Sequence, residues 1–162
     1  MFSTASGEES KQSSRPLYYV CDNALYHILL NGQDMRFSFP RFPAEFEIPD
    51  EWWSESGMDG FTPSNRGYRS TATATLVPLP DIEPPFRSLE CPLDFCGFDR
   101  ERLISVLKGI ATGAEIDPVP LRELPPVDAF FPLPHLYQVR DGFHRFYGSV
   151  AAGFECLSAE IS

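Results

Sequence analysis

Proline limits the length of regular structure in this chain more than any other feature of the sequence. Sixteen of the 162 residues are proline, about 10%, where ordinary proteins carry roughly 5%. A proline inside a helix or a central strand removes a backbone hydrogen bond, so long uninterrupted elements are disfavoured. The hydrophobic share of 43% is nonetheless enough for a core. We therefore expect one packed domain of short elements joined by rigid loops.

Three parts of the chain differ in composition. Residues 1–15 carry no hydrophobic period and predict a disordered leader. Residues 16–74 are a proline- and aromatic-rich extension that we expect to pack on the core. Within it, 17–21 predicts a strand, 25–30 fits a strand or a helix equally well, and 37–46 predicts an extended segment laid on a surface. Residues 75–162 hold the clearest helix and strand patterns.

Two adjacent tryptophans lie in a predicted short helix. Pro49 and Asp50 supply a helix start before Trp52 and Trp53. Adjacent residues point to different sides of a helix, so one tryptophan is expected to be more exposed than the other. Such a side chain either anchors a protein partner or simply packs.

The charge balance is acidic along the whole chain. Thirteen Lys and Arg stand against 23 Asp and Glu, giving a net charge of −10. Duplex DNA repels such a chain at long range, so DNA binding is disfavoured unless a local positive patch supplies it. The sequence has neither a secretory signal nor an apolar run of membrane-spanning length, which predicts a soluble cytoplasmic protein without a membrane partner.

The four cysteines do not form a metal-binding pattern. Cys91 and Cys96 are close in sequence, but no histidines cluster near them, and Cys21 and Cys156 are distant. We expect reduced, buried thiols.

The second part of the chain predicts a small mixed α/β fold. Residues 70–79, 136–140 and 156–161 have strand composition, and 119–121 is a short apolar run between prolines. A helix is expected over residues 99–112, with Asp99 as its N-cap, Phe98 packing on Leu103, and Gly113 ending it. Its apolar stripe comprises Leu103, Ile104, Leu107, Ile110 and Ala111.

A strand, a glycine turn and a helix start follow one another near the carboxyl end. The strand at 136–140 leads into Gly142, and a helix of apolar period runs from Phe143 to a stop at Gly153. The first turn of a helix has unpaired N–H groups and a positive dipole end, so this arrangement favours an anion.

Basic residues gather at the same turn. Arg140, His144 and Arg145 lie within six positions of an otherwise acidic chain, which favours phosphate binding over a plain solvated helix start. An arginine on the ligand side is expected to make few structural contacts. Asp141 has two readings: it caps the helix, or it holds a divalent ion such as Mg²⁺ and orients water. His144 is either a phosphate contact or a half-exposed first-turn residue.

The turn resembles a known sequence motif. Residues 137–147, followed by Ala151, Ala152 and Gly153, are similar to the Gly-x-His/Arg-Arg box of the ParB/sulfiredoxin superfamily. Other segments resemble the superfamily in the same order: 77–82 with Arg87 looks like its first strand and turn, 99–112 like the next helix, and 116–121 like the strand before the box. The similarity covers roughly residues 75–162.

The resemblance implies a small mixed sheet with packed helices and a nucleotide phosphate site at the box. It carries phosphate contacts over to His144 and Arg145, with close backbone approach at Gly142. Together with the other candidates, the expected nucleotide- and phosphate-binding set comprises Arg87, Arg140, Gly142, Phe143, His144 and Arg145. The catalytic candidates are Asp141, His144 and Arg145, with ATP or another nucleotide and Mg²⁺ as cofactors.

This chain lacks the reactive cysteine that sulfiredoxins have in the motif. Sulfiredoxins carry a reactive cysteine directly before the His-Arg pair, where this chain has Phe143. We therefore expect no sulfinic acid reductase activity. Some stand-alone members are described as nucleotide hydrolases or nucleases of the ParB-like type, which makes an ATPase or DNase the first hypothesis. The alternative is a non-enzymatic interaction module, nucleotide-switched or DNA-associated, that binds a protein through residues 37–86.

Overall fold

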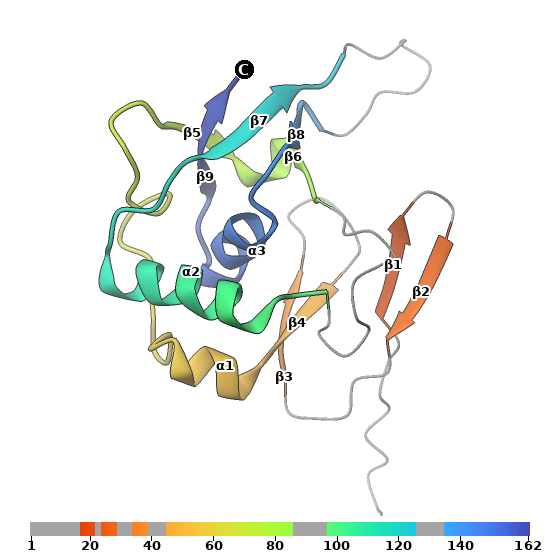
Figure 1. The fold of residues 1–162 in the computed structure, drawn as a ribbon, viewed down its shortest axis with the longest axis vertical. Helices are drawn as coiled ribbons and strands as arrows, with labels where there is room; N and C mark the ends of the chain where they lie inside the picture. The colour runs from red at the N-terminus through yellow and green to blue at the C-terminus, as the bar shows by residue number, and fades with distance from the viewer. Residues whose placement is uncertain (1–16, 22–23, 29–33, 39–44, 86–96, 126–134) are drawn as a thin grey trace, which may run out of the picture.

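Five short strands form a mixed sheet that curls around one helix in the computed structural model (Figure 1). The structure describes residues 17–21, 24–28, 34–38, 45–85, 97–125 and 135–162. In spatial order the strands are β5 (Thr75–Pro78), β9 (Cys156–Ile161), β7 (Val119–Glu123), β8 (Tyr137–Val139) and β6 (Ile82–Glu83). A one-turn 3₁₀ helix, η1 (Leu79–Asp81), joins β5 to β6.

Strand directions in this sheet are mixed. β9 runs antiparallel to β5 and parallel to β7, whereas β8 runs antiparallel to β7 and parallel to β6. The predicted mixed sheet is thus confirmed, as are strands at 119–121, 136–140 and 156–161. The predicted strand at 70–79 is too long: β5 begins only at Thr75, because the chain makes a turn in which the Ala74 N–H donates to the Thr71 carbonyl.

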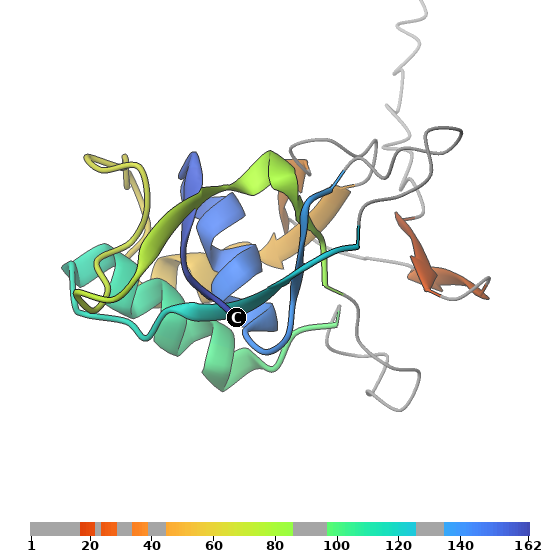
Figure 2. The same ribbon diagram turned by 90° about the horizontal axis from the view of Figure 1, so that it is seen from above.

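Within the described ranges, three α-helices lie on one side of the sheet. They are α3 (Phe143–Ala152), α2 (Arg100–Thr112) and α1 (Asp50–Glu55), stacked in that order below the sheet in Figure 1. Figure 2 shows the strands curving around α3. The order of the layers places α3 at the centre of the molecule.

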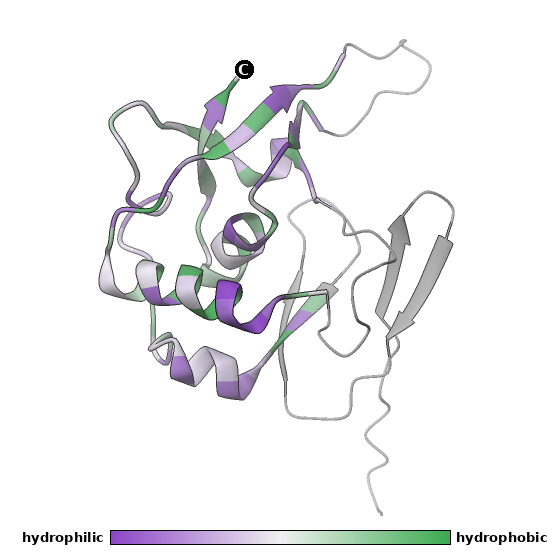
Figure 3. Ribbon diagram, in the orientation of Figure 1, coloured by the Kyte–Doolittle hydropathy of each residue, from purple (hydrophilic) through white to green (hydrophobic). Residues whose placement is uncertain are grey.

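The bounds of α2 follow from its end residues, as predicted. The Asp99 Oδ1 atom accepts a hydrogen bond from the Arg102 backbone N–H at 2.9 Å, and Gly113 ends the helix with φ of 68°. Leu103, Ile104, Leu107 and Ile110 are buried, which confirms the inward stripe. Figure 3 shows hydrophilic colour over the first turn of α2.

Two antiparallel hairpins precede α1. β1 (Leu17–Cys21) pairs with β2 (Ala24–Ile28), and β3 (Asp34–Ser38) pairs with β4 (Glu45–Pro49). The strand at 17–21 is confirmed, and the run at 25–30 contains a strand. Of the segment expected to be extended at 37–46, residues 39–44 lie outside the described part, and Phe46 at its end is fully buried and packs edge-on against Tyr147.

The core includes side chains from both the extension and the second part of the chain. From the extension come Phe46, Ile48, Trp53, Met58 and Tyr68, all buried in the same hydrophobic cluster as residues of the sheet, α2 and α3. Trp53 is buried and Trp52 is half-buried, so the pair differs in exposure as expected, but both pack on the core.

Several predictions concern residues outside the described part. The leader at 1–15, Cys91 and Cys96, and Arg87 all fall there. Cys156 is described, and its thiol is free and buried, as expected. No helix in the described residues combines the length and the apolar character that a membrane crossing requires.

Candidate functional site

The turn between β8 and α3 requires glycine at residue 142. Gly142 has φ of 126°, and a Cβ atom there would lie 3.0 Å from both γ-carbons of Val119. Both the backbone angle and the close approach to β7 therefore disfavour any residue with a side chain. The expectation that Asp141 caps the helix is wrong, because Gly142 occupies the N-cap position and no side chain caps it. Asp141 precedes the cap, with its side chain 88% exposed.

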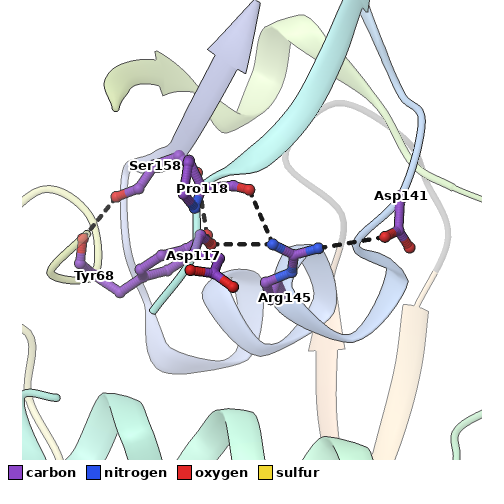
Figure 4. A network of polar contacts seen from close by, with 6 residues as sticks. All are labelled: Tyr68, Asp117, Pro118, Asp141, Arg145 and Ser158. Atoms are coloured by element: carbon purple, nitrogen blue, oxygen red, sulfur yellow. Dashed lines mark hydrogen bonds and ion pairs between the residues drawn. The ribbon is translucent and has the colours of Figure 1, made fainter. Parts of the chain in front are cut away.

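Arg145 joins this turn to the loop before β7. Its Nη1 donates to the backbone carbonyls of Asp117 at 3.1 Å and Pro118 at 2.9 Å (Figure 4). Its Nη2 lies 3.7 Å from the Asp141 Oδ2 atom, and the Arg145 side chain is only 19% exposed. The expectation of few structural contacts for Arg145 is wrong, since one nitrogen of its guanidinium is occupied by backbone carbonyls.

Tyr68 extends the same network to β9. Its hydroxyl donates to the carbonyl oxygens of Asp117 at 2.9 Å and Ser158 at 3.1 Å, while the Ser158 hydroxyl donates to the Tyr68 carbonyl at 2.6 Å. Burial raises the pKa of the Tyr68 phenol well above its ordinary value; the Arg145 charge lowers it and the Asp117 charge raises it. The Tyr68 hydroxyl therefore stays protonated and donates a hydrogen bond to the same loop that Arg145 contacts.

His144 connects the starts of the two helices. It is 7% exposed, and its Nε2 accepts a hydrogen bond from the Asp99 backbone N–H at 3.0 Å. An accepting Nε2 carries no proton, so in this arrangement that atom cannot donate to a phosphate. The structure therefore gives His144 a positioning contact between α2 and α3, which differs from both readings of the sequence.

A pocket of about 530 Å³ lies between α2 and the turn at residues 141–145. From the turn it is lined by Asp141, Gly142, Phe143, His144 and Arg145, and from α2 by Glu101, Arg102, Ser105 and Val106. The structure thus brings five predicted residues of the turn together and adds a second wall.

The second wall was only weakly signalled in the sequence. Arg102 and Ser105 are three residues apart, which puts them on one face of the predicted helix. The amphipathic pattern of residues 99–112 does not predict which element lies next to the polar face of the helix. Arg102, Ser105 and Glu101 are exposed, so their polar groups are accessible to a ligand.

Two other predicted site residues are not part of the pocket lining. Arg140 is exposed, and its Nη1 donates to the Ser162 hydroxyl at 3.3 Å, beside the end of β9. Its backbone N–H donates to the Pro120 carbonyl. Arg140 therefore strengthens the sheet near the pocket without lining it. Arg87 lies outside the described residues.

The pocket combines opposite charges with an apolar part. Its lining includes Arg102 and Glu101 from α2, the pair Arg145 and Asp141 from the turn, and the apolar side chains of Phe143 and Val106. Within the described ranges, no group of three or more His, Cys, Asp or Glu side chains is placed to hold a metal ion.

Comparisons with known proteins add no relative: no family model, curated protein or solved structure matches this chain.

Proposed function

We propose that this chain binds a nucleotide through its phosphates in the pocket between α2 and α3, and hydrolyses a phosphoanhydride or phosphodiester bond there. The observation that carries the proposal is the meeting of Arg102 and Ser105 with the start of α3 across one pocket. A guanidinium, a hydroxyl and the positive end of a helix dipole are groups that bind phosphate oxygens. The volume of about 530 Å³ is in the range of small-molecule sites.

Three basic residues take different roles in this proposal. Arg102 is exposed on the pocket wall and supplies the main phosphate contact. Arg145 fixes the turn through the Asp117 and Pro118 carbonyls, and its Nη2 faces the pocket side where Asp141 lies. His144 holds the start of α3 against the N-cap of α2.

In the proposed hydrolysis, the carboxylates of Asp141 and Glu101 hold a divalent ion. Mg²⁺ is commonly held by one or two carboxylates together with substrate phosphates, where it neutralises developing charge. Asp141 is highly exposed, and Glu101 is exposed on the opposite wall, so both side chains fit that use. Their share of the chemistry is to hold the ion beside the phosphates and to orient the attacking water.

The proposal includes a ParB/sulfiredoxin-like domain over residues 75–162. Its support is the order of elements, β5, η1, β6, α2, β7, β8, α3 and β9, in which the glycine turn joins a strand to a helix as the motif implies. Phe143 in place of the reactive cysteine keeps sulfinic acid reduction out of the proposal.

The interaction-module alternative concerns residues 37–86, of which 39–44 and 86 lie outside the described part of the chain. Of the described aromatic residues in 37–86, Phe46, Trp53 and Tyr68 are buried, while Trp52 and Phe61 are half-buried and pack on the core. A protein partner for this segment remains a prediction.

Calorimetric titration with ATP and CTP tests the binding site. We expect Arg102→Ala to weaken nucleotide binding roughly ten- to a hundredfold, the scale of a lost charge-assisted hydrogen bond. Arg100→Ala is the matched control, because Arg100 is in the same helical turn but pairs with Glu55 and does not line the pocket. Equal affinity in the two variants would contradict the assignment.

Turnover separates an enzyme from a binding protein. Phosphate release from ATP and nicking of plasmid DNA, each with Mg²⁺, are measured for the wild type and for Asp141→Asn. The proposal expects one Mg²⁺-dependent activity, reduced in the variant while nucleotide still binds. Binding without either activity would reduce the function to nucleotide binding alone.

A further inference from the structure

Phe143 is an aromatic residue fixed at the wall of the pocket. It is the first residue of α3 and is half-buried. Its ring centroid lies 4.6 Å from that of Tyr147, 5.5 Å from that of Phe98 and 5.4 Å from that of His144. Because Phe98 and Tyr147 are almost completely buried, they form a rigid support behind the ring. Phe143 therefore presents part of a preorganised apolar surface to the pocket.

The charges that line the pocket cancel formally. Arg102 and Arg145 contribute two positive charges, and Glu101 and Asp141 contribute two negative ones. A ligand that consists only of phosphate gains little from the summed field of these side chains. Tight binding of a phosphate compound then depends on directed hydrogen bonds together with covered apolar surface.

We infer that the pocket takes a nucleoside phosphate whose base lies against the ring of Phe143. This inference rests on the proposed nucleotide function. It adds that the base, as well as the phosphates, is recognised by the pocket. Phosphate donors and a fixed aromatic ring in one pocket match a molecule that is anionic at one end and flat at the other. Stacking on an aromatic ring tolerates all bases, since each base has a π face. Phe143 is thus a specificity residue for nucleosides over other phosphates, with little choice among bases.

Paired ligands test the inference without relying on a variant. ADP and ribose 5-diphosphate carry the same sugar and phosphates, and only ADP has a base. We expect the wild type to bind ADP roughly five- to a hundredfold more tightly, which is the range of base stacking on an aromatic side chain. We expect GDP and CDP to bind within a few-fold of ADP.

Substitution of the ring isolates its contribution. In Phe143→Leu, the affinity for ribose 5-diphosphate is expected to stay near that of the wild type, while the preference for ADP falls toward one. Phe143→Tyr keeps the ring and is expected to keep the preference. Phe154→Leu is the matched control, because Phe154 is a half-buried aromatic residue beyond the other end of α3.

The outcomes distinguish this inference from the function on which it rests. Equal wild-type affinity for ADP and ribose 5-diphosphate would overturn the role of Phe143 and leave phosphate binding intact. An unchanged preference in a folded Phe143→Leu protein would do the same. If neither compound binds to the wild type, the proposed function fails and the role of Phe143 fails with it.

Discussion

Single residues determine the geometry of the pocket more than its charge pattern does. Gly142 permits β7 and α3 to approach, and no side chain could replace its hydrogen atom without moving Val119. Tyr68 and Arg145 both bond to the Asp117 carbonyl, one from each side of the loop. The position of the turn therefore depends on hydrogen bonds that Tyr68 and Arg145 donate to backbone carbonyls of the loop before β7.

Tyr68→Phe tests the network behind the pocket. The substitution removes the hydroxyl that donates to the Asp117 and Ser158 carbonyls. We therefore expect a loss of roughly 0.5–1.5 kcal/mol in the free energy of unfolding at pH 7. Chemical denaturation of both proteins measures the difference.

The stability difference between wild type and Tyr68→Phe is expected to depend on pH. Because the pKa of Tyr68 is raised in the folded protein above its ordinary value of 10.0, its stabilisation is complete below about pH 10 and is lost as the pH rises further. The stability gap between wild type and Tyr68→Phe should therefore be constant from pH 7 to pH 9 and shrink above pH 10. A gap that grows above pH 10 would contradict a raised pKa.

At the scale of elements, the start of α3 is held at several points. Arg145 bonds it to the loop before β7, His144 bonds it to the start of α2, and Gly142 packs it on β7. The helix start is thereby fixed before any ligand arrives, which favours binding because little order has to be created.

Arg145→Ala is expected to destabilise the fold. The guanidinium is mostly buried and donates to two backbone carbonyls, so its loss should cost about 1.5–3 kcal/mol. Arg140→Ala is the control: that side chain is exposed and donates a long hydrogen bond to the Ser162 hydroxyl, so a change within about 0.5 kcal/mol is expected. Equal unfolding midpoints for the two variants would show that Arg145 has no structural role.

The elements with strong local signals were predictable from the sequence. The bounds of α2 followed from Asp99 and Gly113, and the end of α3 followed from Gly153, because caps depend on a few adjacent residues. The glycine turn and its basic residues were likewise visible. The burial of Phe46 was not predictable, because its partners Phe98 and Tyr147 are distant in sequence.

The candidate site was predictable only in part for the same reason. The turn at 141–145 was identified, but its capping was assigned to Asp141, since the sequence does not reveal that Gly142 contacts Val119. The roles of Arg145 and His144 depend on the Asp117 carbonyl and the Asp99 N–H, which tertiary packing alone brings within reach. The placement of Arg102 and Ser105 in the pocket could not be predicted, because it depends on how α2 packs on α3.

At the scale of the whole molecule, the sheet, α3 and α2 form successive layers (Figures 1 and 2). The pocket is lined by residues from the first turns of α2 and α3. Side chains of the extension, such as Phe46 and Trp53, complete the core beneath these layers. The aromatic cluster of Phe46, Phe98 and Tyr147 thus connects the extension to the residues that support Phe143. Removal of the extension would uncover the support of the pocket.

Titration of the ¹⁵N-labelled protein with ATP and Mg²⁺, followed by amide chemical shifts, locates the site in the whole molecule most directly. We predict saturable shifts that are largest at residues 101–106 and 141–145, with the amides at 75–78 and 113–116 little changed, because these segments do not line the pocket. Saturable shifts centred on another surface, or none at millimolar ATP, would contradict a nucleotide site between α2 and α3.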